Sequence, residues 1–190
     1  MTQLSKRVVA QRQLVAAIRL FFDEADLVPV YSLAANAWEI IDTLATREGV
    51  DSISNQTREH VPEGKDLKYD YINSPYRNFF KHADRDPEAL VPPLKDENVE
   101  SIVFLAVEDY LRLFRRSPVE FQVYQLWYLA KYEEKLSFDA AGRILDDLRQ
   151  AFPDIQNLER GEQLSKARSV LALACEDVAL KNDPRTEECL

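Results

Sequence analysis

The sequence is poor in residues that several common protein classes need. Glycine occurs only four times in 190 residues, which argues against a hairpin-rich β fold and against glycine-rich phosphate-binding loops. The two cysteines, Cys175 and Cys189, are too few for a disulfide framework and are not spaced as paired metal ligands. No apolar run approaches the roughly 18 residues that a membrane-spanning helix needs. We therefore expect a cytoplasmic protein without a membrane partner.

Positive charge is also scarce. The chain has 24 Lys and Arg residues against 33 Asp and Glu residues, which gives a formal net charge of -9. This balance disfavours a broad electrostatic footprint for duplex nucleic acid or for an anionic membrane. It leaves room for a small cationic pocket that holds one phosphate, and most of the acidic excess is interpreted as solubilising charge.

Helical periodicity is what the sequence has in abundance. Apolar residues recur at steps of three and four over 4–23 and again from Pro29 to Gly49. Pro29 suits a first helical turn and Gly49 suits a C-terminal stop. Further helices are expected over residues 74–87, 96–116, 118–135, 138–152 and 155–182. We predict an all-α fold, an antiparallel helical bundle of about six to seven helices with a C-terminal helical extension.

The chain is expected to form a single helical domain over residues 1–190. Its core bundle is predicted at about 4–135 and its C-terminal helices at about 137–182. Residues 50–73 lack periodicity and are expected to form a long loop, and residues 183–190 are expected to be a frayed tail.

Two local signals refine this prediction. The small residues Ala34, Ala35 and Ala37 would allow a neighbouring helix to approach closely, which indicates the central helix of the bundle. Ser117, followed by Pro118 and Glu120, resembles a capping box at the start of the helix expected over residues 118–135.

The stretch SPYRNFFKHADRDP, residues 74–87, is the most unusual segment. A helix opened by Ser74 and Pro75 would divide it into two faces. The face toward the bundle would hold Tyr76, Phe79, Phe80 and Ala83. The opposite face would hold Arg77, Asn78, Lys81 and His82. From spacing alone this polar face is most simply a solvated surface, and the functional alternative is a phosphate site.

The arrangement Arg77-Asn78-x-x-x-His82 resembles the signature of the HEPN superfamily, in which an Arg and a polar residue precede a His by a few positions. Members are all-α bundles that commonly dimerise and place two such motifs across the interface. Many cleave RNA without a metal, and others are inactive modules that bind nucleic acid or protein partners. The stretches YSLAANAWEIIDTL and YINSPYRNFFKHADRDP are also similar to a group of bacterial helical proteins with an NFFKHADRDP-type block.

The HEPN resemblance implies catalytic roles for three residues. His82 would move protons to and from the 2′-OH and the leaving oxygen. Arg77 would stabilise the charge of the phosphate, and Asn78 would orient the phosphate or the imidazole. Tyr76 and Lys81 would add phosphate contacts.

Glu39, on the preceding long helix, is a candidate carboxylate partner for this motif. Its plainer interpretation is an exposed helix charge. The short motif helix, which Pro87 ends at once, and the acidic composition depart from what an active nuclease leads us to expect.

Three functions remain open. The favoured one is a dimeric module, without a cofactor, that binds a nucleotide, RNA or a protein partner. The alternative is a metal-independent endoribonuclease of the toxin or defence type that uses Arg77 and His82. The second alternative is a metal-dependent enzyme with His82, Asp84 and Asp86 as ligands. His60 is interpreted as a solvated residue, and Cys175 as a buried structural thiol rather than a nucleophile.

Overall fold

The prediction of an all-α helical fold is confirmed. A computed structural model of the protein describes residues 3–84, 86–135 and 142–188. Over these residues the regular structure is helical, and the one extended pairing is an isolated bridge between Ser117 and Thr186. None of the helices described is long and apolar enough to cross a membrane.

The chain divides into two compact units. Unit 1 comprises residues Met1–Ala17 and Asp26–Arg115, and unit 2 comprises Ile18–Ala25 and Arg116–Leu190. Helix α1 (Lys6–Phe22) contributes residues to each unit. The other helices of unit 1 are α2 (Leu27–Glu48), α3 (Ile53–Glu59), η1 (Leu67–Arg77) and α4 (Asp96–Phe114).

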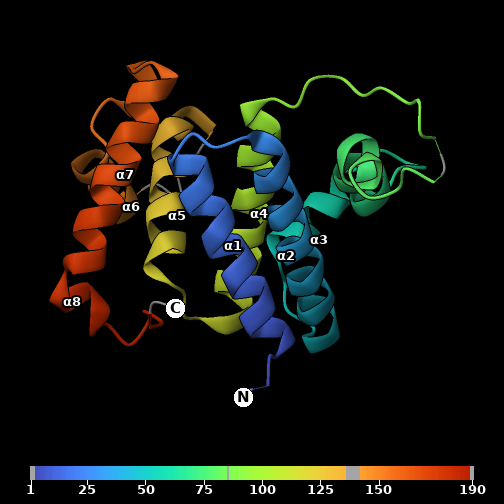
Figure 1. Ribbon diagram of the computed structural model, residues 1–190. Helices are drawn as coiled ribbons and strands as arrows, with labels where there is room; N and C mark the ends of the chain where they lie inside the picture. Colours follow the sequence, from blue (N-terminus) through green and yellow to red (C-terminus); the bar gives the residue numbers. More distant parts are fainter. Residues whose placement is uncertain (1–2, 85, 136–141, 189–190) are drawn as a thin grey trace. The chain divides into compact units, whose positions relative to one another are not determined.

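Helices α2 and α4 lie side by side and form the core of unit 1 (Figure 1). The Asp26 side chain caps α2 by accepting a hydrogen bond from the Val28 amide, and Pro29 lies in the first turn. Gly49 ends the helix with φ of 66°, a conformation that glycine adopts without strain. The three small residues of α2, Ala34, Ala35 and Ala37, are fully buried, as expected for a helix that a neighbour approaches closely.

The expectation of a long loop over 50–73 is wrong, because this segment contains α3 and the first part of η1. The Ser52 hydroxyl caps α3 and the Asp66 carboxylate caps η1. Helix α3 is held to its neighbours by polar contacts rather than by an apolar stripe. Periodicity therefore does not reveal it.

The predicted helix over 74–87 is also wrong. At Ser74 the backbone leaves the helical region, with φ of -107° and ψ of 139°, and the Ser74–Pro75 peptide bond is cis. Helical structure ends at Phe79, and the chain continues through turns toward α4. Ser74 therefore does not cap a helix, and Ala83 is exposed rather than packed against the bundle.

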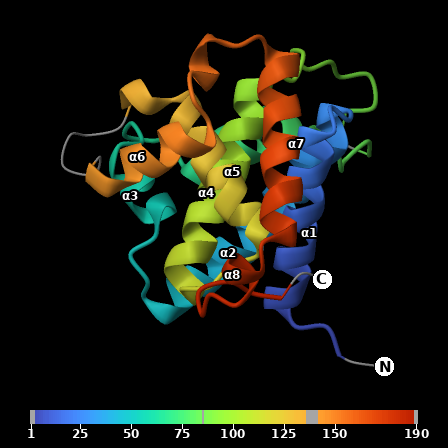
Figure 2. The ribbon, with the colours of Figure 1, turned by 90° about the vertical axis from the view of Figure 1, so that its left-hand side faces the viewer.

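Unit 2 is built on α5 (Val119–Lys131), which lies beside α6 (Gly142–Ala151) and α7 (Arg160–Glu176) (Figure 2). The short helices are η2 (Glu133–Lys135), η3 (Ile155–Asn157) and α8 (Val178–Lys181). The predicted start of a helix near residue 137 lies outside the described residues. An aromatic cluster of Phe21, Phe22, Tyr124 and Trp127 fills the core, with ring centroids 5.5–6.3 Å apart.

Two expectations for unit 2 are wrong. Ser117 does not cap α5, whose N-cap is Pro118 without a side-chain hydrogen bond. The Glu120 side chain turns inward, is 1% exposed, and pairs with Arg19 at 2.5 Å. The C-terminal tail, expected to be frayed from residue 183, is held by backbone hydrogen bonds instead. The Ser117 amide donates to the Arg185 carbonyl, and the Glu187 amide donates to the Ser117 carbonyl.

A buried polar network joins α2, α3 and α4 in unit 1. The indole Nε1 of Trp38 donates to the Ser54 Oγ at 2.8 Å, and that hydroxyl donates to Asp109 at 2.5 Å. Asp109 is fully buried. Burial raises the pKa of its carboxyl group, and the negative charge of Asp42 adds to the rise, which outweighs the hydrogen bonds from Ser54.

We expect Asp109 to make stability fall as pH rises. Because its folded pKa is raised above the usual 3.8, the folded state binds the proton more tightly. The resulting stabilisation is complete below the pKa of the unfolded carboxyl group and is lost as pH rises through the folded pKa. In urea unfolding from pH 3 upward, Asp109→Asn should therefore gain stability relative to the native chain as pH increases. A stability difference between Asp109→Asn and the native chain that stays constant with pH would contradict the assignment.

Candidate functional site

The candidate site is a cluster of charged and amide side chains between α2 and η1 in unit 1. Its centre is Glu39 of α2, which accepts a hydrogen bond from Lys68 Nζ at 2.6 Å and another from Arg77 Nη2. Both cations come from η1, so this helix faces α2 with its basic side chains. The structure thus brings together two residues that sequence analysis selected, Glu39 and Arg77.

Helical spacing predicts that Arg77 lies on a solvated face, and this prediction is wrong. Its side chain is only 9% exposed. Nη1 donates to Asn73 Oδ1 at 2.9 Å, and Nε and Nη2 donate to Asn36 Oδ1 at 3.3 and 3.1 Å. The kink at Ser74 turns this part of the chain, so the spacing of a straight helix does not apply. All three guanidinium nitrogens are engaged, and Arg77 anchors η1 to α2.

Glu39 is held in its charged form by this cluster. Burial by itself would raise the pKa of Glu39, but the hydrogen bonds from Lys68 and Arg77 outweigh it and hold the pKa below its usual value. The carboxylate therefore offsets one of the nearby positive charges at neutral pH.

Lys81 adds a third cation without adding a carboxylate. Desolvation lowers the pKa of Lys81, and repulsion from Arg77 lowers it further. Its ammonium group forms no ion pair with any residue in the part of the chain that the structure describes. Around the one carboxylate of Glu39, the cluster thus gathers the positive charges of Lys68, Arg77 and Lys81.

The remaining predicted residues lie at the edge of this cluster or outside it. Asn78 is exposed, and its backbone carbonyl accepts from the amides of Lys81 and His82. The His82 side chain is 39% exposed, with Nδ1 3.9 Å from Asp84 Oδ1. Tyr76 is buried and donates its hydroxyl to the Pro93 carbonyl at 3.3 Å, so it does not face solvent as a phosphate ligand would.

No metal centre is found among the described residues. His82, Asp84 and Asp86 do not form a group that could hold a metal ion there. The other histidine, His60, is exposed at the end of α3, as expected, whereas Cys175 is half-buried rather than buried.

Three members of the cluster, Asn36, Lys68 and Asn73, are not among the residues predicted from the sequence. A signal for Asn36 was present, because it precedes Glu39 by three positions on α2 and therefore shares its helix face. Lys68 and Asn73 lie in the segment that was expected to be a loop, where no helical face could be assigned.

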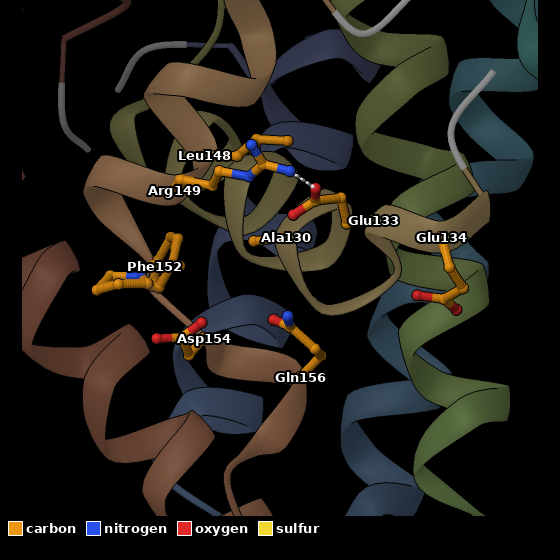
Figure 3. A pocket seen from close by; sticks show the side chains of 9 residues that line it. Ala130, Glu133, Glu134, Leu148, Arg149, Phe152, Asp154 and Gln156 are labelled. Atoms are coloured by element: carbon orange, nitrogen blue, oxygen red, sulfur yellow. Dashed lines mark hydrogen bonds and ion pairs between the residues drawn. The ribbon is translucent and has the colours of Figure 1, made fainter. Parts of the chain in front are cut away.

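A separate cavity of about 580 Å³ lies in unit 2 between α5, α6 and η3 (Figure 3). Figure 3 shows Arg149 reaching across to Glu133, with which it forms an ion pair. Glu134 and Asp154 add two more carboxylates to the lining. None of the residues selected from the sequence as site residues lines this cavity, and its acidic character does not suit an anion.

Comparisons of the chain with protein-family models, with curated proteins and with solved structures gave no match.

Proposed function

We propose that the protein binds a phosphate monoester, such as a nucleotide or an RNA end, at the cluster of Lys68, Arg77 and Lys81. The observation that carries the proposal is the position of Lys81. Its ammonium is repelled by Arg77 and Lys68, is attracted by Glu39, and forms no ion pair within the described part of the chain. An anion placed there would relieve this repulsion and gain charge-assisted hydrogen bonds.

The position of Arg77 favours binding over RNA cleavage. A cleaving arginine must direct its guanidinium at the phosphate, but Arg77 is nearly buried and donates to Glu39, Asn36 and Asn73. In the proposed site, Arg77 supplies positive charge and holds η1, while Lys68 and Lys81 contact the ligand. His82 is partly exposed, and its backbone amide donates to the Asn78 carbonyl.

The proposal includes a homodimer, as the HEPN resemblance implies, and a cytoplasmic location, which the scarcity of cysteine favours. A second copy of the cluster would give one bound RNA or nucleotide two sets of cations. Sedimentation equilibrium tests this part separately from ligand binding.

The test of the site is a charge-removal variant with a matched control. We expect Lys81→Ala to weaken binding of AMP and of a 5′-phosphorylated fluorescent RNA by about five- to tenfold at low salt, since one nearby unit charge contributes about 1 kcal/mol. Lys6→Ala removes the same charge from an exposed position of α1 and should change affinity less than about twofold. Calorimetry and fluorescence anisotropy measure these affinities.

Two outcomes would contradict the proposal. One is the absence of binding by either ligand at millimolar concentration, and the other is an equal effect of Lys81→Ala and Lys6→Ala. If the RNA is instead cut in the presence of a chelator, and His82→Ala abolishes the cutting, the ribonuclease alternative replaces the binding module.

A further inference from the structure

Unit 1 contains a pocket formed between α3, η1 and α4. It is open to solvent on one side and has a volume of about 550 Å³, within the range of about 300–1,000 Å³ in which proteins hold small molecules. Its walls are mainly apolar and aromatic, and include Leu67, Ile72, Ile102 and Leu105. This pocket is distinct from the cluster of Glu39, Lys68, Arg77 and Lys81 described above, which we call the Glu39 cluster, because none of these four residues lines the pocket.

The polar groups of the pocket wall are mostly occupied already. The Tyr31 hydroxyl donates to the Ile72 carbonyl at 2.8 Å, and burial raises the pKa of Tyr31 to about 12, with the neighbouring Tyr76 adding to the rise. The Thr57 hydroxyl donates to the carbonyl of Ile53. The wall therefore offers an apolar surface with few free hydrogen-bonding groups.

The charge at the pocket comes from one residue. Glu97, in the first turn of α4, is exposed and forms no hydrogen bond or ion pair with the residues that the structure describes. No lysine, arginine or histidine lines the pocket. A bound amine would meet an unpaired carboxylate, whereas a bound carboxylate would meet a like charge.

We propose that this pocket, which we name the α3–η1–α4 pocket, binds a small ring-bearing apolar molecule that carries a single amine. The ring system packs against the apolar wall, and the ammonium group lies toward Glu97. The ligand chemistry is opposite in charge to that of the Glu39 cluster, so the two sites do not compete for one ligand.

The test compares three probes of equal ring size. We expect 2-(naphthalen-1-yl)ethylamine to bind about two- to fivefold more tightly than 2-(naphthalen-1-yl)ethanol at low salt, because a partly exposed ion pair contributes this much. We expect 1-naphthylacetic acid to bind more weakly than the alcohol. Protein-detected NMR titration measures all three affinities and identifies the residues that shift.

Three variants make the test specific. Glu97→Gln should bring the affinity of the amine down to that of the alcohol, while Glu63→Gln, an exposed carboxylate outside the lining, should leave it unchanged. Ser101→Phe places a large side chain at the exposed edge of the pocket and should weaken all probes at least about tenfold, with no core residue altered. Failure of the amine and the alcohol to bind at millimolar concentration, undiminished binding in Ser101→Phe, or equal affinity of amine and acid would overturn the proposal.

Discussion

Glu39→Ala should lower the free energy of unfolding by about 2–3 kcal/mol at neutral pH. The reason is that Arg77, whose side chain is 9% exposed, would keep its charge without a carboxylate partner. The pair is part-buried, with the Glu39 side chain 32% exposed, so the expected loss is smaller than for a fully buried pair, in which the remaining charge stays completely desolvated. Urea unfolding measures the loss. Glu48→Ala, which removes an exposed carboxylate from the same helix, should cost less than about 0.5 kcal/mol.

The double variant Glu39→Ala/Arg77→Met separates the ion pair from the packing of the two side chains. It should recover part of the stability that Glu39→Ala loses, because the uncompensated charge is gone. Phosphate ions should stabilise Glu39→Ala more than the native chain, since the anion then meets three cations and no carboxylate. A loss in Glu39→Ala no larger than that in Glu48→Ala would show that the Arg77 pair contributes little.

The two tryptophans predict a second large effect. Trp38 and Trp127 are both fully buried, and removal of either side chain to alanine should cost about 3–5 kcal/mol. They differ in hydrogen bonding. Trp38 Nε1 donates to Ser54 Oγ at 2.8 Å, whereas Trp127 Nε1 is buried with no hydrogen-bond partner among the residues described.

Phenylalanine substitutions use this difference. Trp38→Phe leaves the buried Ser54 Oγ without the indole donor, while Ser54 still donates to Asp109. It should cost about 1–3 kcal/mol more than Trp127→Phe, which removes an unsatisfied polar atom together with some volume. Thermal or urea unfolding of the two variants gives the comparison. Equal losses would mean that volume alone sets the cost at both positions.

Local sequence signals were sufficient for helices that are long and apolar on one face. In α2, Pro29, Gly49 and the buried alanines are all local features, and each took the expected role. They were insufficient for α3 and η1, because what holds these segments is a set of side-chain hydrogen bonds from residues far away in the sequence. Asp109 is 55 positions from Ser54, and no periodicity within α3 encodes that contact.

The candidate site was predicted only in part, again because its contacts join residues that are far apart in the sequence. Glu39 and Arg77 were selected from the sequence, and they do meet. The expected direction of Arg77 was wrong because one non-helical residue, Ser74, invalidates the regular rotation of about 100° per residue on which the faces were assigned. Lys68 could not be placed while its segment lacked an assigned helix.

The anchoring of η1 has a consequence for the entropy of ligand binding. This helix is tied to α2 by the Tyr31 hydroxyl bond to the Ile72 carbonyl and by the guanidinium bonds of Arg77 to Asn36. The helix that carries Lys68 and Arg77, and that contributes Leu67 and Ile72 to the apolar wall, is therefore ordered before any ligand arrives. A ligand at either place would lose little affinity to ordering the helix, so even a molecule with few contacts retains most of its interaction energy.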